Sequence, residues 1–220
     1  MNKLFHYFLC PSSRFIRIIL IEKKIDFNLF IENFSDPTED YLFKNPAGFF
    51  PVLNTSFDEN IVGSLVIVEY LQNLILSPTL MIKKNENEIR RLLFWFETSF
   101  KNEVIIPLLK EKVFKRFEKN SMPSSHSIRT ARANLKYHMQ YFNHLIKDND
   151  FFIDDKLSYV DLFYGASLTV LDYINELNFY DLEKLKNLYS TIKSRPSFRK
   201  ILADRVVGVN PHSDYLKLDY

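Results

Sequence analysis

The side chains best suited to chemistry lie near the N-terminus, at Cys10, Ser12 and Ser13. A run of large apolar residues, 3–9, predicts a buried strand just before them, and residues 12–23 have the pattern of a helix. A thiol or hydroxyl at this join lies near the free N–H groups of the helix, which favour an anion. A thiol there can have a lowered pKa, and the same position can bind the thiolate of a ligand. The other interpretation is a small buried Cys10 beside two serines that only cap the helix, and the sequence leaves both open.

A second set of candidate residues lies further along the chain. Residues 45–53 read Asn-Pro-Ala-Gly-Phe-Phe-Pro-Val-Leu, which is turn chemistry followed by a short strand. Pro51 by itself fits the first position of a strand. Ser64 follows Gly63 and begins a helical pattern, where its hydroxyl can either help to bind an anion or act as a simple N-cap.

The elements that must position these residues change character along the chain. In the first 75 residues short apolar runs alternate with helical patterns, in the order β-α-β, a connection, then β-β-α. Parallel strands joined by a helical crossover predict an α/β layer. The predicted strands are 3–9, 26–32, 51–53 and 57–62, and the predicted helices are 12–23 and 64–75.

Beyond residue 85 the apolar residues keep a helical period of 3.6. Asn85 and Glu88 are spaced as an N-cap with a glutamate at N3, and Pro107 predicts a kink in the helix that follows. The division that results is an α/β domain over 1–77, a linker over 78–85 and an all-helical domain over 86–220. The later helices are expected at about 125–147, from 158 past 171, at 180–193 and at 197–203.

Composition excludes several classes of function. The chain has 220 residues, a formal net charge of +2 and one cysteine. The small net charge gives no field that would attract nucleic acid or an acidic membrane, and one cysteine allows no internal disulfide. No apolar run approaches the roughly 20 residues of a membrane span, and no signal peptide is recognisable, so a cytoplasmic protein is expected. Four of the five histidines, His126, His138, His144 and His212, have no metal-ligand spacing, and no metal is expected.

The motifs, taken in order, resemble those of the glutathione transferases. Segments 45–53 and 62–71 are similar to the two ligand-binding segments of that family, and 194–197 is similar to its Arg-Pro-Ser turn. Segment 157–161 resembles its buried N-capping box, a folding element with Asp161 at N3. The resemblance implies a thioredoxin-like N-terminal domain, an all-α C-terminal domain and a homodimer.

The resemblance also implies where glutathione, as co-substrate, would lie. The proline matching Pro51 is cis in that family, which frees the backbone of the preceding residue, Phe50, to pair with the cysteinyl part of glutathione. Ser64 matches the serine that holds the γ-glutamyl carboxylate. Gly63 departs from the pattern because the family has a glutathione-contacting side chain at that position. The implied site therefore runs along Cys10, Phe50, Pro51, Gly63 and Ser64.

Two enzyme mechanisms are compatible with this site. An exposed Cys10 would form a mixed disulfide with glutathione, and a second glutathione would release it because no second cysteine is present. Alternatively, Ser12 or Ser13 would stabilise the thiolate of glutathione for attack on an electrophile. Cys10 is favoured because it fills the first place of a Cys-Pro-x-Ser pattern. The protein would then be a glutathione S-transferase or a glutathione-dependent thiol transferase.

One subgroup resembles the chain more closely. Segments 95–104, 111–113 and 194–220 are similar to a transferase-like bacterial cell-division protein that binds FtsZ filaments. The alternative function is therefore a non-catalytic dimeric regulator that binds FtsZ through its C-terminal domain and tail. Gly63 and Phe49 favour it, since both depart from the usual glutathione contacts.

The tail over 206–220 is more apolar than a solvated chain end, and it either binds a partner or packs on its own domain. Removal of residues 209–220 is expected to weaken filament binding and to leave the fold intact. The apolar residues of the tail include Tyr215, Leu216, Leu218 and Tyr220.

Overall fold

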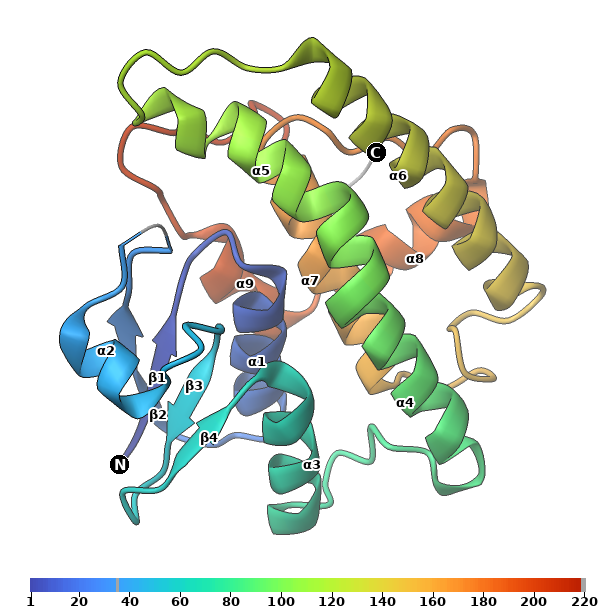
Figure 1. Cartoon of the computed structure of the whole chain (residues 1–220). Coiled ribbons are helices and arrows are strands. Elements are labelled where there is room, and N and C mark those ends of the chain that lie inside the picture. The colour runs from blue at the N-terminus through green and yellow to red at the C-terminus, as the bar shows by residue number, and fades with distance from the viewer. Residues whose placement is uncertain (35, 219–220) are drawn as a thin grey trace.

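The computed structural model describes residues 1–34 and 36–218, and Asp219 and Tyr220 lie outside that part of the chain. Its N-terminal third is a four-stranded sheet in the order β2-β1-β3-β4, with β1 and β2 parallel and the other pairs antiparallel (Figure 1). The strands are β1 (Asn2–His6), β2 (Phe27–Ile31), β3 (Val52–Asn54) and β4 (Asn60–Val62). The helices are α1 (Pro11–Glu22), α2 (Glu39–Lys44) and α3 (Ser64–Leu74). The predicted α/β layer is confirmed, whereas α2 was not predicted.

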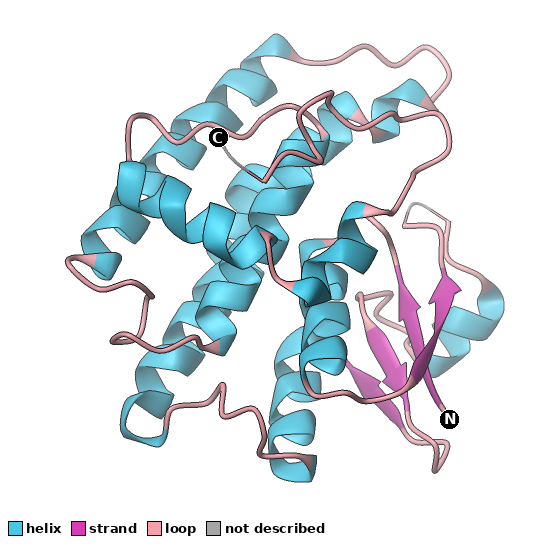
Figure 2. Cartoon of the chain, turned by 180° about the vertical axis from the view of Figure 1, so that it is seen from behind, coloured by secondary structure: helices cyan, strands magenta, loops and turns pink. Residues whose placement is uncertain are grey.

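The rest of the chain is helical, as predicted. Figure 2, from behind, shows the strands on one side of the molecule and the helices filling the remainder. The elements are η1 (Lys83–Asn85), α4 (Glu86–Trp95), η2 (Phe96–Ile105), α5 (Ile106–Lys112), η3 (Phe114–Arg116), α6 (Ser125–Ile146), α7 (Tyr159–Tyr173), α8 (Glu183–Lys193) and α9 (Pro196–Leu202). Each predicted helix is found with ends that differ by a few residues. The domain limits at 77 and 86 stay a prediction.

Two local predictions concern the first long helix, and the kink at Pro107 stays a prediction. The chain is helical from Glu86 to Lys112. Within this stretch the winding changes from α to π over the ten residues of η2, which end just before Pro107. A proline has no N–H for the helical ladder, so the hydrogen-bond register changes upstream of it. Asn85 lies at the N-cap of α4 and Glu88 at N3, as predicted, but the capping hydrogen bond is absent, and Oδ1 of Asn85 is buried without a partner among the described residues.

Helix α7 is the centre of the molecule. All of its residues are buried, and it packs against α1, α4, α8 and η2. Gly165 allows the close approach of its neighbours, since a Cβ there would lie 2.6 Å from Cγ2 of Ile192 and 2.9 Å from Cζ of Phe198. The predicted capping box at its start is confirmed, with Ser158 and Asp161 bonded reciprocally.

The two halves share one hydrophobic core. The ring of Phe15 on α1 stacks on Phe163 of α7 at 4.2 Å between centroids. This contact fixes α1, and with it the residues at its N-terminus, against the helical half.

The C-terminal tail is folded onto the body of the protein. Val209 and Tyr215 are buried, and the Arg14 guanidinium lies 6.0 Å from the centre of the Tyr215 ring. Asp204 forms a buried ion pair with Arg17 of α1. Removal of residues 209–220 is therefore expected to destabilise the protein by opening the core at Tyr215, which argues against using this truncation as a test of filament binding.

Candidate functional site

Cys10 lies at the N-cap of α1, as predicted, and Pro11 occupies the first helical position. Its side chain is buried, with 5% of its surface exposed. Burial raises the pKa of the thiol, and this effect outweighs the opposing effects of Lys101 and Ser13. Cys10 is therefore a covered thiol whose burial opposes the effect expected from its position at a helix N-terminus.

Aromatic rings of the N-terminal half pack beside Cys10, and one of them links to the helical half. Phe50 and Tyr41 stack at 4.9 Å beside it, in one cluster of buried residues. Phe34 stacks on Phe50 and, at 5.1 Å and an interplanar angle of 11°, on Phe114 of the helical half. The bond before Pro51 is cis, in agreement with the predicted geometry. The stack of Phe34 on Phe114 closes the space between the two halves above this loop.

The hydroxyls of Ser12 and Ser64 meet at one acceptor. Ser12 Oγ donates to Oε2 of Glu97 at 2.7 Å, and Ser64 Oγ donates to the same oxygen at 2.5 Å. Lys101, one turn further along η2, donates to the other oxygen of Glu97. Ser12 is the second residue of α1 and Ser64 is the first residue of α3. The structure thus joins two predicted site residues through a carboxylate from the helical half.

Ser13 and Gly63 lie apart from this contact. The Ser13 hydroxyl accepts a hydrogen bond from the Tyr7 backbone N–H at 3.4 Å, so its contacts differ from those of Ser12. Gly63 has φ +88°, a conformation that side chains other than glycine rarely adopt, and a Cβ there would meet no heavy atom within 4 Å. The backbone at this position, rather than lack of space, explains the glycine.

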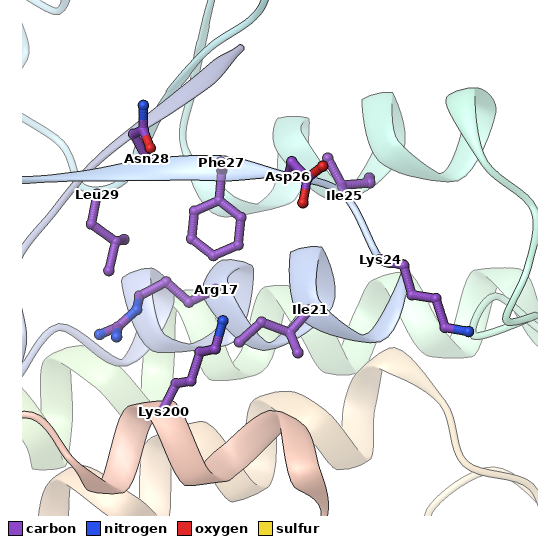
Figure 3. A pocket seen from close by; sticks show the side chains of 9 residues that line it. All are labelled: Arg17, Ile21, Lys24, Ile25, Asp26, Phe27, Asn28, Leu29 and Lys200. Carbon is purple, nitrogen blue, oxygen red and sulfur yellow. The ribbon is translucent and has the colours of Figure 1, made fainter.

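Two cavities lie near this region but are not lined by Cys10, Ser12 or Ser64. A cavity of about 470 Å³ is lined by Tyr7, Asn33, Phe114, Phe117, Glu118, Val206 and Val207. A second, of about 390 Å³, lies between α1, β2 and α9, where Lys200 reaches from α9 toward Ile21 and Phe27 (Figure 3). Within residues 1–34 and 36–218, no group of three or more His, Cys, Asp or Glu side chains could hold a metal ion.

Sequence reasoning missed the residues that close the site. Glu97 is 85 positions from Ser12 and 33 from Ser64, and no local pattern links them. Phe34 and Phe114 are similarly distant in sequence and belong to different halves. The available signal was weak: Glu97 and Lys101 are spaced i,i+4, which usually indicates only a solvated helix pair.

The covered thiol leads to a direct prediction. We expect Ellman's reagent to label Cys10 in the native protein at least about tenfold more slowly than in the urea-unfolded chain at the same pH, because only an accessible thiolate reacts. The signal is unambiguous because the chain has one cysteine. Complete labelling of the native protein at the unfolded rate would contradict the closed site.

No helix in the described part of the chain combines the length and apolar character needed to cross a membrane.

Comparisons with known proteins match nearly the whole chain. The family model "Glutathione S-transferase, N-terminal domain" matches residues 4–75, and "Glutathione S-transferase, C-terminal domain" matches residues 109–205. FtsZ-localized protein A of Caulobacter vibrioides is 34% identical over 222 residues, which cover 99% of this chain and 97% of that protein.

Two solved structures superpose closely. FzlA from C. crescentus has a TM-score of 0.93 and 33% identity, covering 100% of this chain and 99% of the other. A glutathione S-transferase from Sinorhizobium meliloti has a TM-score of 0.93 and 36% identity, with both chains covered completely. The similarity therefore includes the tail as well as the two family domains.

Proposed function

The chain belongs to the glutathione S-transferase family, and from that premise we propose that it is a non-catalytic cell-division protein that binds FtsZ filaments through its C-terminal half and tail. The support is the 34% identity to FtsZ-localized protein A over almost the full length of both proteins. The match to this relative extends over the tail as well as the two domains, which includes the part of the chain where the proposal places the FtsZ contacts.

Exposed apolar side chains on the tail support the proposal. Val209 and Tyr215 anchor the tail in the core, yet neighbouring apolar side chains face solvent. Val207 is 91% exposed and Leu216 is 56% exposed. Apolar side chains held at the surface by an anchored backbone are suited to bind a partner, because little order has to be gained on binding.

The test replaces one exposed tail residue and one matched leucine elsewhere. We expect Leu216→Asp to weaken co-sedimentation with polymerised FtsZ by about tenfold or more, because a charge in the centre of an interface must be desolvated. The matched control is Leu29→Asp on the edge strand β2, since Leu29 is 41% exposed in the free chain and lies outside the tail. Circular dichroism of both variants checks that the fold is retained.

Equal binding of FtsZ by wild type and Leu216→Asp would remove Leu216 from the interface. Absence of co-sedimentation by the wild type, in a preparation where the FtsZ-localized relative does sediment, would overturn the proposed function itself.

The proposal includes a homodimer in the cytoplasm. Apolar side chains lie exposed on the loop before β3, on α3 and on α4, where Phe49 is 66% and Phe94 is 60% exposed. Burial of such residues between two copies is a common reason for their exposure in a single chain.

A second candidate function is glutathione-dependent thiol transfer, favoured by the position of Cys10 at the start of α1. In that reaction the Cys10 thiolate attacks the glutathione sulfur of a mixed disulfide between glutathione and a substrate thiol, forms a mixed disulfide with that glutathione and releases the substrate as its thiolate. A second glutathione thiolate then attacks the mixed disulfide, which regenerates Cys10 and gives glutathione disulfide. The covered thiol disfavours this candidate, because Cys10 must first be deprotonated and uncovered.

A further inference from the structure

We infer that the side-chain carboxylate of Glu97 fills the place between the starts of α1 and α3 where the carboxylate of a ligand would bind. Glu97 thereby determines whether this chain accepts glutathione. The inference does not depend on FtsZ binding. It concerns Ser64, which the family resemblance assigned to glutathione, and Ser12, a candidate for stabilising the glutathione thiolate, and it identifies the group that competes for both hydroxyls.

The contacts at Glu97 are those of a bound carboxylate ligand. Oε2 accepts hydrogen bonds from Ser12 at 2.7 Å and Ser64 at 2.5 Å, and Oε1 accepts one from Lys101. Both carboxylate oxygens are therefore engaged, one by two hydroxyls and one by a cation. Hydrogen bonds to charged groups are roughly twice as strong as neutral ones.

The surroundings of Oε2 add a favourable field. Ser12 and Ser64 belong to the first turns of helices of twelve and eleven residues, α1 and α3. The unpaired N–H groups at these ends give each a partial positive charge. Two such ends meeting at one oxygen favour a carboxylate there over a neutral group, and the chain supplies the carboxylate itself.

A free ligand must therefore displace a tethered one. The Glu97 side chain is only 18% exposed, and that of Lys101 is 20% exposed, so the pair is held within the structure. A tethered group competes at an effective concentration in the millimolar range or above. Glutathione carries two carboxylates, and either one that reaches Ser64 would have to break the bonds of Glu97 first.

The experiment compares two glutamates of the same π segment. Glu97→Ala removes the occupant, while Glu103→Ala removes a carboxylate that contacts His138 and is 51% exposed. Binding is measured by calorimetry with S-methylglutathione, whose blocked thiol cannot exchange with Cys10. We expect Glu97→Ala to bind at least about tenfold more tightly than wild type, and Glu103→Ala to match wild type. Lys101, freed from Glu97, remains as a cation for the incoming carboxylate.

Two further variants make the result specific. In Glu97→Ala combined with Ser64→Ala the gain should be lost, because the hydroxyl that receives the ligand is missing. Glu97→Gln keeps the size of the side chain and serves if the alanine variant fails to fold; it should show a smaller gain, since a neutral amide competes less well than a carboxylate.

The inference is overturned if Glu97→Ala and Glu103→Ala bind S-methylglutathione with equal affinity. If Glu97→Ala is unfolded, Glu97→Gln takes its place in this comparison. Wild-type binding as tight as that of Glu97→Ala would also overturn the inference. Co-sedimentation of the same variants with FtsZ is expected to be unchanged. Calorimetry therefore tests whether Glu97 excludes glutathione, and co-sedimentation separately tests whether the protein binds FtsZ.

Discussion

Asp204→Ala is expected to lower the free energy of unfolding by about 3–5 kcal/mol. The carboxylate of Asp204 accepts two hydrogen bonds from Arg17, at 2.5 and 3.0 Å, and the two side chains are only 6% and 3% exposed. Without it the Arg17 guanidinium is left buried and unpaired at the join between α1 and the tail. Urea denaturation measured by circular dichroism gives the change directly.

A surface pair provides the matched control. Arg91 and Glu88 are bonded at 2.6 Å, but their side chains are 43% and 42% exposed. Glu88→Ala is therefore expected to cost no more than about 1 kcal/mol. If Asp204→Ala costs no more than Glu88→Ala, burial is not what makes the Arg17 pair important.

A double variant separates the pair from the charge it leaves behind. Arg17→Met with Asp204→Leu removes both charges and keeps apolar volume, so most of the lost stability should return. If the double variant is no more stable to urea than Asp204→Ala, the tail depends on the ion pair itself and not on the avoidance of a lone buried charge.

Asp161→Ala is expected to destabilise the protein by a similar amount, about 3–5 kcal/mol, which is a fall in Tm of roughly 6–20 °C for a chain of this size. Asp161 is fully buried and accepts hydrogen bonds from the Ser158 backbone N–H, the Ser158 hydroxyl and the Phe152 backbone N–H, at 2.7, 2.7 and 2.9 Å. Alanine leaves these donors buried without a partner. Thermal unfolding measures the effect.

The control for Asp161 is a cap of the ordinary kind. Ser124 caps α6 through one hydrogen bond to the Ser127 backbone N–H, and its replacement by alanine should cost about 1 kcal/mol. If Asp161→Ala lowers the stability no more than Ser124→Ala does, the hydrogen bond from Phe152 contributes nothing beyond an ordinary cap.

Local features of the sequence predicted the elements well. The apolar period placed α6 at 125–147, against Ser125–Ile146 in the structure, and the spacing of Ser158 and Asp161 predicted the capping box. Such features depend on residues three or four positions apart, which meet on one helix whatever the rest of the chain does. The spacing at Asn85 predicted the N-cap position but not the missing capping hydrogen bond, and the short helix α2 was not predicted.

The sequence by itself determined the fold class, the family and the position of Cys10, Ser12 and Ser64 at the starts of two helices. It could not determine what those side chains face, because that depends on contacts between segments far apart in the chain. Tertiary structure brought Glu97 to both serines and Phe34 onto Phe114, and it buried Cys10. The same residues at the same helix ends would make an open anion site or a closed one according to which side chain the opposite half supplies. In this chain it supplies a carboxylate.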